Sequence, residues 1–158
     1  MSMVATARIP TNASTIAEFS PSVLIVEDDA AAVSEFAELL ELEGLGCVVA
    51  DTPDRALSLM DAFSSIKVIV TDFYLCGSNI GANNGLSLVK NIRDRFANRR
   101  FEAIVISGDK NVVVDCALTG VDKFLAKPVA PENFCAIVRS ALETAPLDKD
   151  LHSSGGSN

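Results

Sequence analysis

An apolar run that ends in a carboxylate occupies residues 67–75 and reads Lys67-Val68-Ile69-Val70-Thr71-Asp72-Phe73-Tyr74-Leu75. Its residues 68–71 do not alternate with polar side chains, which is typical of a strand that is buried on both faces. Such strands belong to parallel sheets that are covered by helices. Asp72 stands where the strand ends, and ligands of open α/β sheets bind outside the carboxyl ends of the strands. The run therefore predicts an α/β fold with a candidate site at Asp72.

Three further apolar segments also end in polar groups. The segments are residues 23–26, 103–106 and 124–126, and they are followed by Glu27-Asp28-Asp29, Ser107-Gly108-Asp109 and Lys127-Pro128. Because the carboxyl ends of parallel strands meet at one edge of a sheet, we expect acidic, hydroxyl and ammonium groups to converge there with Asp72. Unrelated surface acids and a solvated lysine would not explain why each group follows an apolar strand.

Apolar runs alternate with segments of helical periodicity along the chain. Strands are expected near 22–26, 47–50, 67–71, 103–106 and 123–126, and helices near 29–40, 53–63, 85–97, 111–118 and 131–143. Five such alternations predict a doubly wound α/β fold, in which right-handed crossovers place helices on both faces of a parallel sheet. The helix near 111–118 is the weakest prediction, because three successive valines are poor helix formers. Periodicity does not give the strand order.

The composition argues against several classes of protein. A chain of 158 residues is expected to form one domain. Its net charge of −8 argues against a protein that binds the phosphate backbone of nucleic acids, which requires a basic face. No apolar run approaches the roughly 18 residues that cross a bilayer, and the N-terminus has no signal-peptide pattern. We therefore expect neither a nucleic-acid nor a membrane partner.

The cysteines and the histidine argue against further kinds of catalytic and metal site. The four cysteines, Cys47, Cys76, Cys116 and Cys135, form no C-x-x-C pair. We expect them to be reduced thiols in a cytoplasmic protein. The only histidine, His152, lies in a polar tail, so neither His-based catalysis nor a His-rich metal site is expected.

The ends of the chain and one basic segment are not expected to form the site. Residues 1–20 are interpreted as an N-terminal leader, 21–144 as the domain and 145–158 as a disordered C-terminal tail. Four arginines lie on or after the helix near 85–97: Arg93, Arg95, Arg99 and Arg100. They are interpreted as a solvated helix end that the helix dipole favours.

The converging groups suggest phosphoryl chemistry. Glu27, Asp28 and Asp72 would form a hard, oxygen-rich pocket of the kind that suits Mg²⁺. A carboxylate beside Mg²⁺ can attack phosphorus and form an aspartyl phosphate. The charge on the transferring phosphoryl group must be neutralised, and Mg²⁺, the Lys127 ammonium and the Ser107 hydroxyl could each contribute.

In their order and positions, these motifs resemble the receiver domain of two-component response regulators. The matching segments are Leu24-Ile25-Val26-Glu27-Asp28-Asp29, Val70-Thr71-Asp72, Gly85-Leu86, Ser107-Gly108 and Phe124-Leu125-Ala126-Lys127-Pro128-Val129. The resemblance covers residues 21–144. It implies a flavodoxin-like (βα)5 sheet with the strand order 2-1-3-4-5.

The resemblance also implies the roles of the acidic residues. Asp72 would accept a phosphoryl group from a histidine kinase or a histidine phosphotransfer protein. Asp28 would ligate Mg²⁺ directly, and Glu27 would act through water. The backbone carbonyl of Tyr74 would complete the metal shell together with Asp72.

Two further residues would form the switch that the resemblance implies. The Ser107 hydroxyl would move to the phosphoryl group while the Phe124 ring turns inward. Lys127 would bind a phosphoryl oxygen, and the peptide bond before Pro128 would be cis. The surface of the fourth helix, fifth strand and fifth helix (about 111–143) would then change shape and bind a downstream partner or a second copy. The chain would be a signalling switch that assists its own phosphorylation and dephosphorylation, not a turnover enzyme.

Two exposed positions are expected to tune the lifetime of the phosphoryl group. Tyr74, two residues beyond Asp72, could cover the approach of the hydrolytic water. Asp109, two residues beyond Ser107, could instead orient that water. We expect the bulkier Tyr74 to slow hydrolysis.

The chain departs from the family pattern in two places. The loop over 75–85 is longer than usual and lacks the proline common there, and the stretch over 107–127 is slightly shorter. A stand-alone receiver, or one cut from a larger protein, is expected. A phosphate-independent pseudo-receiver is the alternative. A Mg²⁺-dependent phosphohydrolase would need an acid where Tyr74 stands, and a flavin-binding domain would need a phosphate loop after the first strand.

Overall fold

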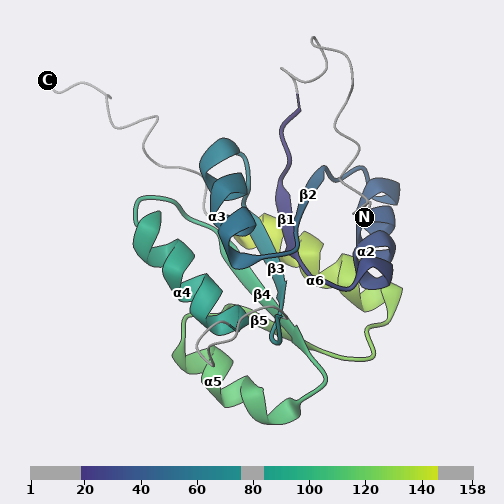
Figure 1. Ribbon diagram of the computed structural model, residues 1–158. Helices are drawn as coiled ribbons and strands as arrows, with labels where there is room; N and C mark the ends of the chain where they lie inside the picture. The colour runs from purple at the N-terminus through teal and green to yellow at the C-terminus, as the bar shows by residue number, and fades with distance from the viewer. Residues whose placement is uncertain (1–18, 76–83, 146–158) are drawn as a thin grey trace, which may run out of the picture.

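Five parallel strands form a single sheet in the computed structural model, which describes residues 19–75 and 84–145. The strands are β1 (Val23–Val26), β2 (Cys47–Ala50), β3 (Val68–Asp72), β4 (Glu102–Ser107) and β5 (Lys123–Ala126). Their order is β2-β1-β3-β4-β5, so the predicted flavodoxin-like topology is confirmed (Figure 1).

Helices cover both faces of the sheet. They are α2 (Ala30–Leu42), α3 (Pro53–Ala62), α4 (Gly85–Arg95), the 3₁₀ turn η1 (Lys110–Val112), α5 (Val113–Leu118) and α6 (Pro131–Thr144). The helices α2 and α6 pack on one face, where Phe36 and Phe134 stack with ring centroids 4.5 Å apart. The helices α3, α4 and α5 lie on the other face (Figure 1).

The strand register brings the carboxyl ends of β1, β3 and β4 to the same level. Val26 pairs with Thr71, and Asp72 pairs with Ile106. Glu27 therefore follows β1 beside the end of β3, and Ser107 follows Ile106 beside Asp72. The register alone gathers these side chains at one edge of the sheet, as predicted.

Three helices begin at side-chain caps. Asp29 accepts hydrogen bonds from the backbone N–H groups of Ala31 and Ala32, Thr52 accepts one from Arg55, and Asn84 accepts one from Ser87. These caps satisfy N–H groups that have no partner within the helix. Gly44 follows α2 with a φ of 74°, the left-handed conformation that glycine adopts most readily.

The predicted helix over 111–118 is present, but its first turn is not α-helical. Residues Lys110–Val112 form a 3₁₀ turn, and the α-helix starts only at Val113. The Asp109 carboxylate accepts a hydrogen bond from the N–H of Asn111, which fixes the tight first turn. Val113 and Val114 nevertheless begin the α-helix, so the β-branched side chains weaken the helical pattern without preventing the helix.

Two of the four arginines form specific contacts and are not a solvated helix end. Arg93 donates to the carbonyl of Gly120, forms a 2.8 Å ion pair with Asp122, and lies over the Phe101 ring. Arg99 donates to the carbonyls of Met60, Phe63 and Ile66 around the C-terminus of α3. The first arrangement, called the Arg93 clamp below, ties α4 to the segment between α5 and β5.

Several predicted segments lie outside the described residues. They are residues 1–18 of the leader, residues 146–158 of the tail and residues 76–83 of the long loop. Among residues 19–75 and 84–145, no helix has the length and apolar character that crossing a membrane requires.

Candidate phosphoryl-acceptor site

Three carboxylates meet where β1 and β3 end. Each of Glu27, Asp28 and Asp72 offers an oxygen within 4.8 Å of the others. Glu27 is buried, Asp28 is exposed, and Asp72 lies between these extremes. The sequence predicted this cluster, and the structure brings all three residues together.

Glu27 is electrostatically perturbed by its burial in the cluster. Burial is the main reason why its pKa rises from 4.5 to about 7, and the nearby charge of Asp72 raises it further. The N–H of Asp29, which donates to Glu27 Oε1 at 3.1 Å, opposes this rise, as does the charge of Lys127. The pocket therefore concentrates negative charge that a cation would stabilise.

A hard divalent cation fits this donor set. The cluster offers only carboxylate oxygens, one of them on an exposed side chain, and such sites suit Mg²⁺, which keeps several of its waters. A thiol-preferring metal would find no ligand in the cluster. The cluster contains the three carboxylates among the predicted metal ligands, to which the family resemblance adds the backbone carbonyl of Tyr74.

Lys127 lies on the other side of Asp72. Its Nζ atom is 3.3 Å from Asp72 Oδ2, and their side chains are 41% and 11% exposed. The Lys127–Pro128 peptide bond is cis, as the resemblance implied. Asp72 is thus placed between a group of acids and one ammonium group, which suits a carboxylate that must receive an anion.

Ser107 and Phe124 occupy different environments on neighbouring strands. The Ser107 side chain is 1% exposed, and its Oγ atom accepts a hydrogen bond from the N–H of Asp109 at 3.1 Å. Phe124 is partly buried on the α5 side of the sheet, against a small cluster of Phe73, Leu86, Val105, Val112 and Cys116. Both predicted switch residues lie near α5.

The end of β3 is held by backbone contacts that sequence reasoning did not identify. The N–H of Gly85 donates to the Phe73 carbonyl at 2.7 Å, and a Cβ atom on Gly85 would lie 2.4 Å from the Asp72 carbonyl oxygen. Thr71 donates its hydroxyl to that same oxygen at 2.9 Å. The signal for the close approach was a glycine at the first position of α4, after the Asn84 cap, where glycine is a poor helix former.

Tyr74 and Asp109, the two residues expected to tune the phosphoryl lifetime, are hydrogen-bonded to each other. The Tyr74 hydroxyl donates to Asp109 Oδ2 at 3.3 Å, and 58% of the tyrosine is exposed. Loss of solvation, together with the charge of Asp109 and this hydrogen bond, raises the pKa of Tyr74. The sequence did not reveal the contact, because the strand order alone does not fix the directions of the Tyr74 and Asp109 side chains.

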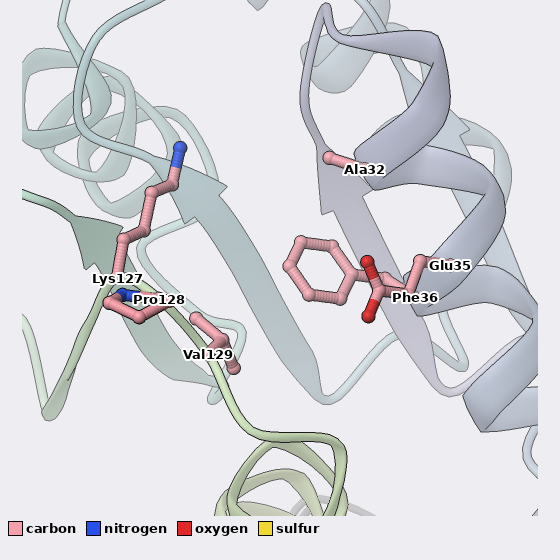
Figure 2. Close-up of a pocket in the computed structure, with 6 residues that line it drawn as sticks. All are labelled: Ala32, Glu35, Phe36, Lys127, Pro128 and Val129. Atoms are coloured by element: carbon pink, nitrogen blue, oxygen red, sulfur yellow. The ribbon is translucent and has the colours of Figure 1, made fainter.

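A cavity of about 480 Å³ opens beside Lys127, whose ammonium group contacts Asp72. It is lined by Ala32, Glu35 and Phe36 of α2 and by Lys127, Pro128 and Val129 of the β5–α6 loop. In Figure 2 the Phe36 ring and the Lys127 side chain lie on opposite sides of this space. The Lys127 side chain is therefore accessible through a largely apolar opening.

Comparison with known proteins agrees with this geometry. Residues 23–139 match the response regulator receiver domain. The two-component response regulator PprB of Pseudomonas aeruginosa is 32% identical over 114 residues, which cover 70% of this chain and 40% of PprB. The putative two-component response regulator ARR13 of Arabidopsis thaliana is 30% identical over 125 residues, which cover 77% of this chain and 21% of ARR13.

A solved structure shows the same architecture. The receiver domain of NtrX from Brucella abortus superimposes with a TM-score of 0.68 at 26% identity, covering 78% of this chain and 99% of that one. The chain spans less than half the length of PprB and ARR13, and it matches NtrX over the receiver domain alone. By its sequence, its sheet order and its acidic edge, this chain belongs to the response regulator receiver domain family.

Proposed function

We propose that Asp72 accepts a phosphoryl group from a phosphohistidine on a histidine kinase or phosphotransfer protein. The observation that carries this proposal is the position of Asp72, with two acids within 4.8 Å and the Lys127 ammonium at 3.3 Å. An Asp72 carboxylate oxygen would attack phosphorus while the phosphorus–nitrogen bond of the donor breaks. The product is an aspartyl phosphate and a neutral imidazole.

Residues around Asp72 would share the charge of the transferring group. Lys127 would exchange its contact with the Asp72 carboxylate for a phosphoryl oxygen, and Ser107 would donate its hydroxyl to another. Asp28, Asp72 and the Tyr74 carbonyl would hold Mg²⁺ directly, with Glu27 acting through water. The metal supplies Lewis-acid stabilisation of phosphoryl oxygens.

We place the donor beside the cavity between α2 and the β5–α6 loop. The cavity opens next to Lys127, so a donor side chain lying there could reach the Asp72 carboxylate. Its apolar walls, including the Phe36 ring, would exclude water from the transferring group. We assign this reaction to the cytoplasm, as the cysteine pattern predicts.

We propose that the surface of α5, β5 and α6 reports the state of Asp72 to a downstream partner or a second copy. Three apolar side chains are exposed on α5: Val113 at 41%, Val114 at 66% and Leu118 at 81%. Exposed apolar groups of this kind are suited to a protein contact. The protein acts as a switch, so its partner must bind the two states with different affinities.

Phosphoryl incorporation tests the acceptor. The full chain is incubated with acetyl phosphate and Mg²⁺, and the phosphorylated residue is located by mass spectrometry. We expect incorporation in the wild type and in Asp94→Asn, an exposed acid on α4, and none in Asp72→Asn. Equal incorporation in Asp72→Asn would refute the assignment of Asp72, and no incorporation in the wild type would favour a phosphate-independent module.

Calorimetry tests the metal site separately. Asp28→Ala should remove Mg²⁺ binding, because a hard cation loses a charged oxygen ligand, whereas Asp94→Asn should retain it. Unchanged affinity in Asp28→Ala would place the metal elsewhere.

Amide hydrogen exchange tests the output surface. With beryllofluoride as the phosphoryl mimic, we expect altered exchange over residues 111–143, and no change when Asp72→Asn receives the same treatment. A response confined to residues 76–84 would make the long loop the output element instead.

A further inference from the structure

Asp109 connects three parts of the site through three hydrogen bonds. Its N–H donates to Ser107 Oγ at 3.1 Å, Oδ1 accepts from the N–H of Asn111 at 2.9 Å, and Oδ2 accepts from the Tyr74 hydroxyl at 3.3 Å. One residue therefore links the switch hydroxyl, the start of η1 and the loop that follows the acceptor. Both carboxylate oxygens of Asp109 are engaged in this state.

The Tyr74–Asp109 hydrogen bond spans the two strands that carry the acceptor chemistry. Tyr74 follows Asp72 at the end of β3, Asp109 follows Ser107 at the end of β4, and the two strands are direct neighbours. The edge of the Tyr74 ring packs against Phe73, with ring centroids 4.6 Å apart. The bond thus joins the two strand ends across one side of the acceptor site.

We infer that Tyr74 and Asp109 form a latch that holds the unphosphorylated state and opens when Ser107 moves. The inference rests on the proposed function and adds a coupling between the movement of Ser107 and the Tyr74–Asp109 hydrogen bond. When Ser107 turns toward a phosphoryl group, the Asp109 N–H loses its acceptor. The Asp109 backbone must then shift to find another partner, which carries Oδ2 away from the Tyr74 hydroxyl.

The latch changes the expected roles of both residues. While it is closed, Asp109 is occupied by Tyr74 and Asn111 and does not orient a hydrolytic water. Once it is open, Oδ2 becomes available for that purpose, and η1 loses the fixed orientation of its cap. Tyr74 is therefore a positioning residue that acts through Asp109, and opening the latch links phosphorylation to the start of α5.

The sequence supplies a direct probe of this contact. The chain has one tyrosine and no tryptophan, so tyrosine emission arises from Tyr74 alone. A carboxylate that accepts a hydrogen bond from a phenol quenches its emission. We expect emission to rise when Mg²⁺ and beryllofluoride are added to the wild type, and to be high without them in Asp109→Asn. Asp115→Asn, which removes an exposed acid from α5, should behave as the wild type.

A double-mutant cycle tests the coupling. Because the latch opposes the Ser107 movement, Tyr74→Phe should bind beryllofluoride more tightly by roughly two- to tenfold, the effect of losing one hydrogen bond. Asp109→Ala removes the acceptor together with its charge and should tighten binding further. Adding Tyr74→Phe to Asp109→Ala should then have no additional effect, because the latch is already absent.

The possible failures can be distinguished. If calorimetry shows beryllofluoride binding while Tyr74 emission stays constant, the latch is wrong and the proposed function stands. Additive effects in the cycle, or low emission in Asp109→Asn, would also refute the latch. If the wild type binds no beryllofluoride at all, the proposed function fails, and the coupling fails with it.

Discussion

The strands β1 and β5 belong to the same sheet but differ in how the protein covers them. All four residues of β1 are buried, with none more than 1% exposed, whereas all four residues of β5 are partly exposed. β1 lies between two other strands and beneath helices on both faces, and β5 is an edge strand. The domain therefore has a firmly packed side around β1 and a more loosely covered side around β5.

The helices differ in how they begin. The helices α2, α3 and α4 each begin at a side chain that caps the helix, namely Asp29, Thr52 and Asn84. The helices α5 and α6 have no side-chain cap bond. A helix without such a cap leaves N–H groups to solvent and opens at lower cost in free energy.

Asp72 lies between these two sides. It ends β3, which pairs with β1 on one side and with β4 on the other. In the proposed function, one sheet would carry both a rigid site that holds oxygen atoms for phosphoryl transfer and a more easily deformed surface that a partner detects.

The largest expected effect comes from truncating one leucine on each side. Leu24→Ala in β1 should lower the free energy of unfolding by about 3–5 kcal/mol, because a fully buried side chain leaves a cavity. Leu125→Ala in β5 should lower it by about 1–2 kcal/mol, because that site is partly open to solvent. Urea unfolding measures both, and equal losses would contradict the division into two sides.

A smaller effect is expected from substituting Gly85, which lies against Asp72, than from truncating a buried leucine. Gly85→Ala should destabilise the protein by about 2 kcal/mol, because its Cβ would meet the Asp72 carbonyl oxygen at 2.4 Å. Gly108→Ala is the matched control, since its Cβ would lie 3.9 Å from Lys127 Cβ and should change stability by less than about 0.5 kcal/mol. Thermal unfolding of both variants decides the point. If Gly85→Ala does not change the stability, the backbone at the end of β3 can shift to accommodate the added methyl group.

The smallest effects concern helix caps. Thr52→Ala should cost about 1 kcal/mol, because the N–H of Arg55 loses its acceptor. Ala130→Ser should stabilise the protein by about 0.5 kcal/mol, since Ala130 precedes α6 in an extended, exposed conformation that suits a capping hydroxyl. Chemical denaturation gives both changes. A loss of stability in Ala130→Ser would show that a serine at this position does not cap α6.

Much of the fold and the acidic site could be predicted because both depend on local patterns. Each strand is a short apolar run, and the residues Glu27, Asp28, Asp72 and Lys127 come directly after such runs. Parallel strands then gather their ends without further information. The strand order came only from the family resemblance, because periodicity shows that a strand exists but not which strand lies beside it.

The remaining features depend on contacts between segments that are far apart in the sequence. The Tyr74–Asp109 hydrogen bond joins residues 35 positions apart, and the Arg93 contact with Asp122 joins residues 29 positions apart. The close approach of Gly85 to Asp72 requires the position of α4 over the sheet. The 3₁₀ turn depends on the Asp109 cap outweighing the α-helical pattern of the following residues.

The Arg93 clamp has a mechanical consequence for the proposed switch. It fastens the segment after α5 at Gly120 and Asp122, so this end of the helix acts as a hinge and the end near Asp109 is the moving arm. The six residues of α5 span about 9 Å, so a rotation of about 10° would displace the far end by roughly 1.5 Å. A partner seated over Val114 would experience most of that displacement, and one seated over Thr119 almost none. The distance from the Arg93 clamp thus determines how much of the displacement a partner bound along α5 would detect.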